Sequence, residues 1–144
     1  MFTIEVEGLI ETQLRFEKAL DSLPRNIQGI LEETAEETIE KAKVLATERL
    51  KQPGTYLTSF YISPAVLEVR FGNIHRAARF IEFGTRPHAI EPVTRKALRF
   101  EADGRIVFAR RVLHPGTEPC LILSDALTEQ LAILNEKIRE AIKI

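Results

Sequence analysis

The chain changes character at the stretch Phe80-Ile81-Glu82-Phe83-Gly84-Thr85-Arg86-Pro87. The residues before this stretch are acidic and have helical periodicity, whereas those after it are basic and form strand-sized segments. Apolar residues at helical spacing predict a short helix leading into Gly84, which stops the helix because glycine adopts positive φ without steric cost. The proline that follows Arg86 favours an extended conformation for that arginine.

A second glycine-threonine turn lies further along the chain, at His114-Pro115-Gly116-Thr117-Glu118-Pro119. Proline followed by glycine at the centre of a turn is typical of type II geometry, in which the glycine has positive φ. We therefore expect Gly84 and Gly116 to adopt backbone conformations that residues with a Cβ atom avoid.

Two further helices are predicted on either side of the basic segment. The first runs from about Leu23 to Lys51, with Ser22 as its candidate N-cap and Pro53-Gly54 as its end, and a separate short helix is expected over residues 10–21. The second follows the turn at Gly116, where leucine and isoleucine repeat nearly as a heptad. Both helices have an apolar stripe with which to pack.

Segments of period two predict strands between these helices and at the beginning of the chain. They are the alternating residues Phe2, Ile4 and Val6, the pair Tyr56–Ile62 and Ala65–Phe71 joined by a turn at Ser63-Pro64, and the pair Ala97–Glu101 and Arg105–Arg110 joined at Asp103-Gly104. The expected fold is α+β. In it, one antiparallel sheet is covered by the long helix of the N-terminal half and by the C-terminal helix, as a single domain over residues 1–144.

The small net charge of −1 hides a strong asymmetry. Residues 1–69 have a net charge of −5, residues 70–114 of +6 and residues 115–144 of −2. Nine of the ten bases in the central segment are arginines, whose guanidinium groups pair with carboxylate and phosphate groups. These arginines are solvated charges on strands or, taken together, a surface for another subunit or for nucleic acid.

Taken in order, these features are specific: the Glu-Phe-Gly-Thr-Arg-Pro stretch, a strand over residues 96–100, a short hairpin, the His-Pro-Gly-Thr turn and an amphipathic C-terminal helix. The set resembles the small tail-component family of long-tailed double-stranded DNA bacteriophages and prophages, described as tail-completion, neck or head–tail joining proteins. The chain departs from the family pattern at Pro119-Cys120-Leu121, where members often carry Pro-Phe. The resemblance implies a ring of subunits in the virion neck or tail, with the host cytoplasm as its location before assembly.

Few residues point to catalysis or to a cofactor. His75, His88 and His114 are scattered without metal-ligand spacing, the single Cys120 has no base near it in the sequence, and the glycines do not form a phosphate-binding loop. The glutamates of the long helix are best explained as a solvated face. No apolar run is long enough to cross a membrane. The sequence therefore predicts no enzyme, no metal or cofactor site and no small-molecule substrate.

Two hypotheses remain. In the first, the protein is a structural subunit of the phage neck or upper tail that contacts its own copies and neighbouring neck or tail proteins, with possible contact to DNA in the channel. In the second, it is a small nucleic-acid-binding module that uses an arginine-rich sheet. The first hypothesis assigns assembly contacts to the two turns, namely to Glu82, Phe83, Gly84, Thr85, Arg86, Pro87, His114, Pro115, Gly116 and Thr117.

Overall fold

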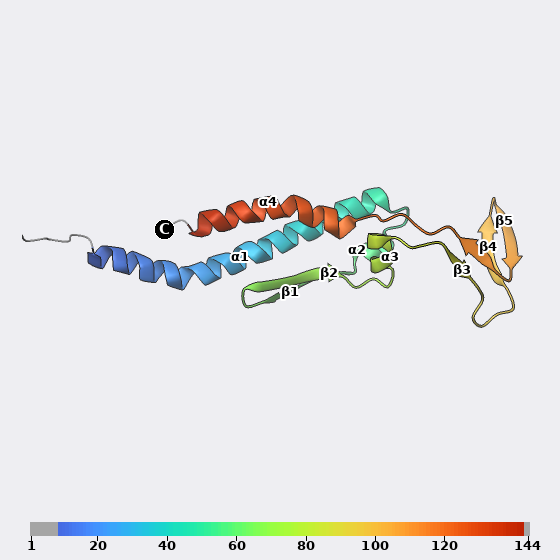
Figure 1. Ribbon diagram of the computed structural model, residues 1–144, viewed down its shortest axis with the longest axis horizontal. Coiled ribbons are helices and arrows are strands. Elements are labelled where there is room, and N and C mark those ends of the chain that lie inside the picture. The colour runs from blue at the N-terminus through green and yellow to red at the C-terminus, as the bar shows by residue number, and fades with distance from the viewer. Residues whose placement is uncertain (1–8, 143–144) are drawn as a thin grey trace, which may run out of the picture. The chain divides into compact units, whose positions relative to one another are not determined.

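The structure is a computed structural model and describes residues 9–142 (Figure 1). The strand expected at Phe2, Ile4 and Val6 therefore lies outside the described residues. Internal contacts divide the chain into two compact units. We call Met1–His75 with Ile122–Ile144 the helical unit, and Arg76–Leu121 the ladder unit. The expectation of a single domain over residues 1–144 stays a prediction beside this division.

The predicted mixture of helices and antiparallel strands is confirmed, but within residues 9–142 the strands form three two-stranded sheets rather than one. The helical unit contains α1 (Leu9–Arg49), α2 (Gly54–Leu57), β1 (Phe60–Ala65), β2 (Glu68–Asn73) and α4 (Ile122–Ile142). The ladder unit contains α3 (Ala78–Phe83), β3 (His88–Ile90), β4 (Leu98–Ala102), β5 (Arg105–Ala109) and β6 (Val112–His114). The pairs are β1–β2, β3–β6 and β4–β5, all antiparallel.

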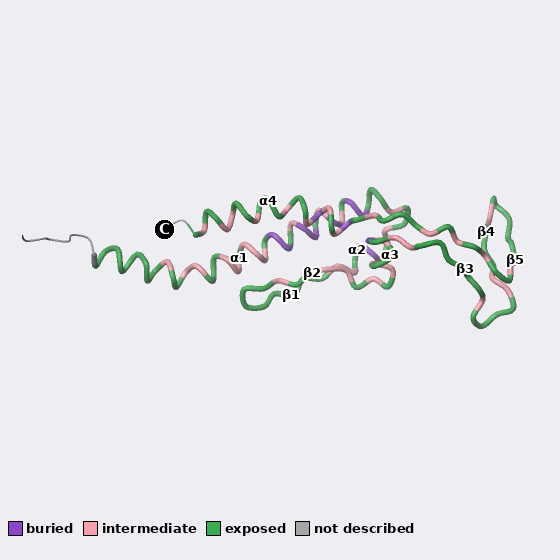
Figure 2. Tube along the Cα trace, in the orientation of Figure 1, coloured by how far each residue is buried: buried purple, intermediate pink, exposed green. Residues whose placement is uncertain are grey.

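The core of the helical unit lies where α4 runs back along α1, as Figure 1 shows. Burial is concentrated in the C-terminal half of α1 and the beginning of α4 (Figure 2). The buried apolar residues are Ala35, Ile39, Ala42, Leu45, Ala46, Tyr56, Ile122 and Ala126. Because four of these eight are alanines, the backbones of the packed elements can approach closely, and the packing of the long helix against the C-terminal helix is confirmed.

Ion pairs along the edge of this contact fix the register of the two helices. Arg49 lies 2.6 Å from Asp125, Lys41 lies 2.9 Å from Glu129, and Lys137 lies 3.0 Å from Glu33 and 3.4 Å from Glu37. Hydrogen bonding to Glu33 raises the pKa of Lys137 above its ordinary value. Exposed pairs of this kind contribute little stability individually, so their main role is to select one alignment of α4 on α1.

The beginning of α1 differs from the prediction. The helix starts at Leu9 and continues through Pro24, so the separate helix over residues 10–21 and the N-cap at Ser22 are wrong. A proline inside a helix removes one backbone hydrogen bond. Nearby side chains donate to carbonyl groups of the same turn, since the Ser22 hydroxyl lies 3.3 Å from the Ala19 oxygen and the Arg25 guanidinium 3.4 Å from the Asp21 oxygen. Neither bond replaces the one that Pro24 cannot donate to the Leu20 carbonyl, so the helix passes the proline without that bond.

The β1–β2 hairpin also differs from the prediction. Its register pairs Ala65 with Glu68, so the turn is made by Val66 and Leu67, whose φ is 53°, while Ser63 and Pro64 belong to β1. The strand expected from Tyr56 is wrong at its beginning, because residues 54–57 form the short helix α2, with the Tyr56 amide 2.8 Å from the Pro53 oxygen. Proline and glycine therefore start a helical turn here, whereas α1 already ends at Arg49.

We expect Ala42→Leu to destabilise the helical unit by about 1–3 kcal/mol, since overpacking a close-packed core forces side chains and backbone to move. Ala42 is completely buried in α1. Chemical denaturation followed by circular dichroism measures the change. Val44→Leu, two residues further along the same helix and 52% exposed, is the matched control and should change the free energy of unfolding by less than about 0.5 kcal/mol. Equal effects of the two substitutions would contradict the assigned core.

Candidate functional site

The structure brings the two glycine-threonine turns together in the ladder unit. Thr85 and Thr117 exchange both backbone hydrogen bonds, with N–O distances of 3.0 Å and 3.1 Å. Their side-chain hydroxyl groups lie 3.1 Å apart, and the Thr117 amide also lies 3.1 Å from the Thr85 hydroxyl. Two stretches that are more than twenty residues apart in the sequence are therefore joined at one pair of threonines.

This threonine pair belongs to the same ladder as strands β3 and β6. His88 pairs with His114, which lies as many residues before Thr117 as His88 lies after Thr85. The register consequently sets Pro87 opposite Pro115. Proline has no amide hydrogen, so two opposed prolines interrupt the hydrogen bonds, and the ladder is divided into an isolated bridge and a short strand pair.

The mirrored order of residues follows from this pairing. Thr-Arg-Pro-His in one direction faces His-Pro-Gly-Thr in the other, and an antiparallel pair brings like residues together when one stretch reverses the order of the other. Sequence reasoning named His114 as a site residue but missed His88. The reversed order of threonine, proline and histidine in the two stretches was the signal that could have found it.

Both turns require glycine, as predicted. Gly84 has φ 69° and ψ −174°, and Gly116 has φ 92°. A Cβ atom on Gly84 would collide with the carbonyl oxygen of Thr117 and lie 2.9 Å from the backbone nitrogen of Pro119. A Cβ atom on Gly116 would collide with the carbonyl oxygen of Thr85. Each glycine thus leaves room for the backbone of the opposite turn.

The end of helix α3 holds the exit of the second turn. The amide of Cys120 lies 2.8 Å from the Ile81 oxygen and the amide of Leu121 lies 3.2 Å from the Glu82 oxygen. Glu82 is 6% exposed, whereas the neighbouring Phe83 is 66% exposed. We call residues 82–87 together with 114–117 the paired-turn site. It contains every residue that the sequence assigned to assembly contacts.

The two histidines at the end of the site have different hydrogen-bonding roles. Nδ1 of His88 lies 2.9 Å from the Arg86 oxygen, so this nitrogen donates to a carbonyl group. Nδ1 of His114 lies 3.0 Å from the Gly116 amide nitrogen and therefore accepts. The ring centroids are 5.1 Å apart. Among the described residues, no three His, Cys, Asp or Glu side chains are grouped to hold a metal ion.

The ladder unit has almost no buried interior. Of residues 76–121, all of which the structure describes, only Glu82 is buried, and several large apolar side chains are largely exposed. They include Phe80, Phe83, Val93, Phe108 and Leu113. Residues 76–121 together carry nine bases and five acids, a net charge of +4. The paired-turn site is therefore a hydrogen-bonded frame that displays apolar and basic side chains.

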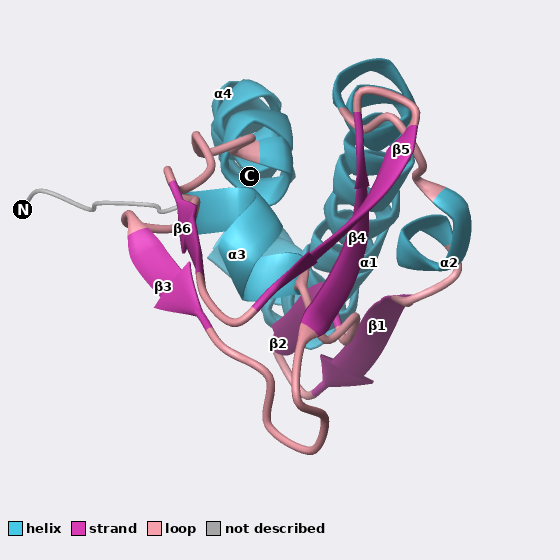
Figure 3. Ribbon diagram, turned by 90° about the vertical axis from the view of Figure 1, so that its right-hand side faces the viewer, coloured by secondary structure: helices cyan, strands magenta, loops and turns pink. Residues whose placement is uncertain are grey.

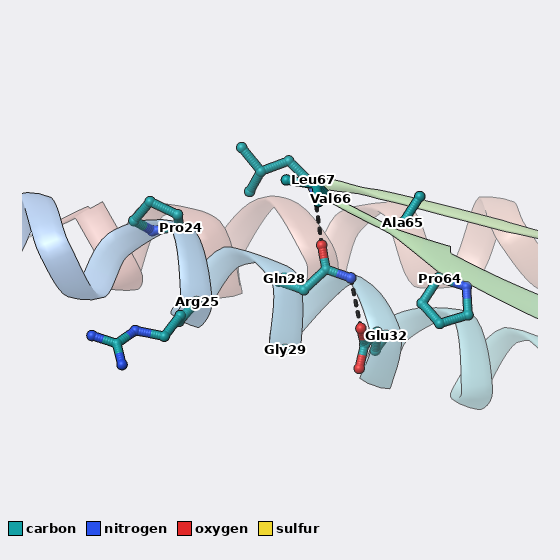
Figure 4. Close-up of a pocket in the computed structure, with 9 residues that line it drawn as sticks. All are labelled: Pro24, Arg25, Gln28, Gly29, Glu32, Pro64, Ala65, Val66 and Leu67. Carbon is teal, nitrogen blue, oxygen red and sulfur yellow. Dashed lines mark hydrogen bonds between the residues drawn. The ribbon is translucent and has the colours of Figure 1, made fainter.

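A groove in the helical unit is a second candidate. It lies between α1 and the tip of the β1–β2 hairpin, has a volume of about 610 Å³, and is shown in Figure 4. Gln28 spans it: its side-chain oxygen lies 2.7 Å from the Leu67 amide, and its side-chain nitrogen lies 2.6 Å from a carboxylate oxygen of Glu32. The amide of Gln28 thus links the hairpin turn to the carboxylate of Glu32 across the groove.

Comparison with models of protein families, with curated proteins and with solved structures finds no match. Within residues 9–142 no helix is long and apolar enough to cross a membrane. What characterises the candidate site is its geometry: two backbone turns paired antiparallel on a unit in which only Glu82 is buried.

Gly84→Ala should destabilise the ladder unit by about 1–3 kcal/mol or more, because it adds backbone strain and a collision with the backbone of the opposite turn. Gly104, in the turn between β4 and β5, has φ 73° but nothing within 4 Å of the added atom, so Gly104→Ala suffers the strain alone. Hydrogen exchange at the Thr85 and Thr117 amides measures the opening of the pair. Equal protection in both variants would contradict the close approach of the two turns.

His114→Ala should weaken the same turn by about 0.5–1.5 kcal/mol, since the Gly116 amide loses its acceptor. His114→Asn is the matched control, because an asparagine side chain can accept from the amide two residues later. Hydrogen exchange at the Gly116 amide distinguishes the two variants. Faster exchange in the asparagine variant than in the alanine variant would show that the imidazole acts in another way.

Proposed function

We propose that the protein is a structural subunit of the neck or upper tail of a long-tailed double-stranded DNA phage or prophage, where it joins head to tail or completes the tail as part of a ring. The observation that carries the proposal is the paired-turn site on a unit with no buried interior. Two of the features on which the family resemblance rests, the Glu-Phe-Gly-Thr-Arg-Pro stretch and the His-Pro-Gly-Thr turn, are the two halves of this frame.

The backbone of the paired-turn site is more constrained than that of an ordinary surface loop. Two glycines in positive-φ conformations, a double exchange between threonines and two opposed prolines hold Thr85, Arg86 and Pro87 in one arrangement. Such constraints lower the entropic cost of binding, because the side chains are ordered before the partner arrives. A subunit that presents Arg86 and Phe83 to a neighbour would bind more tightly because these residues are already ordered. The proposed partners are other copies of the chain and adjoining neck or tail proteins.

The apolar side chains support the same proposal. Monomeric proteins rarely expose large contiguous apolar surfaces, and those that do commonly bind another protein there. The proposed role places the protein in the virion, with the host cytoplasm before assembly, and allows contact with DNA in the channel through the basic surface. It is a structural role and assigns no catalytic residue or cofactor.

The basic side chains favour an alternative, a nucleic-acid-binding module. Arg95, Arg99, Arg110 and Arg111 are exposed, and of these only Arg111 forms an ion pair within the described residues, at 3.5 Å from Glu91. Binding that uses several exposed arginines should weaken steeply with salt, because each neutralised phosphate releases counterions. The two functions therefore predict different losses from different substitutions.

Arg86→Ala should leave the purified subunit folded but prevent its incorporation into tails or heads. Arg86 is exposed, and the hydrogen bond that it accepts from the His88 ring uses its backbone oxygen rather than its side chain. Removal of the side chain should therefore change the free energy of unfolding by less than about 0.5 kcal/mol. Arg86→Glu should impair incorporation more severely, since it not only removes the arginine that would pair with an acidic group of a neighbouring subunit but also adds repulsion between like charges. Yield of finished particles and a thermal melt are the measurements.

Arg95→Ala is the control on the same charged surface, and it should assemble normally under the proposed function. Under the alternative, Arg95→Ala should cause a modest, salt-dependent loss of DNA binding, while the Arg86 variants still assemble. Fully infectious particles with Arg86→Glu, or particles that lack the protein altogether, would defeat the proposed function.

A further inference from the structure

The β4–β5 hairpin has one apolar face that is only partly covered within its unit. Its register pairs Leu98 with Ala109, Phe100 with Val107 and Ala102 with Arg105, and successive residues of a strand point to opposite faces. One face therefore carries these six side chains, of which Arg105 alone is charged. The opposite face carries Arg99, Glu101, Ile106 and Phe108. The first face is therefore almost wholly apolar, whereas the second mixes two charged side chains with two exposed apolar ones.

An isolated two-stranded hairpin is marginally stable in water and needs a third strand or a packed neighbour. Within the ladder unit no other helix or strand packs along β4 and β5. Phe100 is 38% exposed and Val107 is 37% exposed, although both belong to the apolar face. Arg105 stands at the edge of this face, and Arg95, Lys96 and Arg110 flank the hairpin in sequence. Its partner should therefore be apolar at the centre and acidic at the edge.

The helical unit contains a surface of this kind. A groove of about 630 Å³ runs between α1 and β1, and its apolar lining comes from Ile39, Leu57, Phe60, Tyr61 and Ile62. Glu36, Glu40 and Lys43 stand on its helical side. Glu40 already contacts Lys43 at 2.6 Å, whereas Glu36 forms no ion pair among the residues that the structure describes. We call this surface the α1–β1 groove.

Other acids of α1 are less available. Glu33 and Glu37 contact Lys137, and Glu32 accepts from Gln28. Among the glutamates between residues 32 and 40 of α1, Glu36 is therefore the one with which an incoming arginine can pair most readily.

We propose that the β4–β5 hairpin of one copy docks its apolar face into the α1–β1 groove of a second copy, with Arg105 beside Glu36. The inference rests on the proposed function, for which it names the contact between neighbouring subunits. It joins two different surfaces of the same chain, so it is a heterologous contact, and repetition of such a contact closes a ring when the rotation between subunits allows closure. Complementary charge selects the partner and the register.

Charge reversal tests the pair. Arg105→Glu and Glu36→Arg should each weaken self-association about tenfold or more, and the two substitutions combined in one chain should restore most of it, because the pair is re-formed with the charges exchanged. Arg99→Glu is the matched control: it makes the same change on the opposite face of the same hairpin, and it should leave the association constant within about twofold. Sedimentation equilibrium over a range of protein concentrations measures all four.

Disulfide trapping tests whether the contact joins two chains. In a Cys120→Ser background, Glu36→Cys and Arg105→Cys are made in separate proteins, mixed and oxidised. A covalent dimer that contains one chain of each kind supports the proposal. A chain that carries both cysteine substitutions should then form cross-linked oligomers of increasing size. An internal disulfide in the double variant, or no cross-link in either experiment, would overturn it.

The outcomes for the two proposals are separable. A subunit that is incorporated into particles but is monomeric at every concentration and forms no mixed dimer retains the proposed function and loses the hairpin contact. A subunit that self-associates through Arg105 and Glu36 but never enters particles retains the contact and loses the proposed function.

Discussion

The double exchange of hydrogen bonds between Thr85 and Thr117 is the interaction on which the ladder unit depends. It is possible only because Gly84 and Gly116 have no side chains, since a Cβ atom on either would collide with the carbonyl group of the threonine opposite. Two neighbouring elements of the unit are connected to this pair. The histidine pair continues its register, and the end of α3 is hydrogen-bonded to the exit of the second turn. A unit with one buried residue is therefore ordered by backbone pairing more than by a core.

The two units obtain their structure from different forces. The helical unit buries an alanine-rich stripe between α1 and α4, and burial of apolar surface is the dominant favourable term in folding. The ladder unit leaves Phe80, Phe83 and Phe108 exposed and relies on hydrogen bonds, each of which contributes only about 0.5–1.5 kcal/mol net. Figure 3 shows the strand pairs as separate short ribbons rather than one sheet. Such a unit gains most from a partner that covers it.

The sequence predicted those features that depend on neighbouring residues. The helical stripe, the short helix before Gly84, the Asp103-Gly104 turn and the positive φ of both glycines are local consequences of residue type, and the structure has them. Features decided by distant contacts were missed. The hairpin turn lies at Val66-Leu67 rather than at Ser63-Pro64, and there the side-chain oxygen of Gln28 accepts a hydrogen bond from the Leu67 amide. The error at Pro24 is local instead: proline favours the first turn of a helix, but α1 continues through it. The meeting of the two turns also depends on distant residues, and only their mirrored order hinted at it.

The distribution of charge follows from the same division into units. Residues 76–121 have a net charge of +4, while the remaining residues of the chain have a net charge of −5. Between copies of a chain whose two units carry opposite net charge, electrostatics favours contacts of unlike surfaces over contacts of like surfaces. This asymmetry disfavours isologous pairing, in which each surface meets its own kind, and favours heterologous contacts that propagate from copy to copy. A basic unit and an acidic helical unit in one chain are therefore more consistent with the proposed ring than with a two-fold dimer.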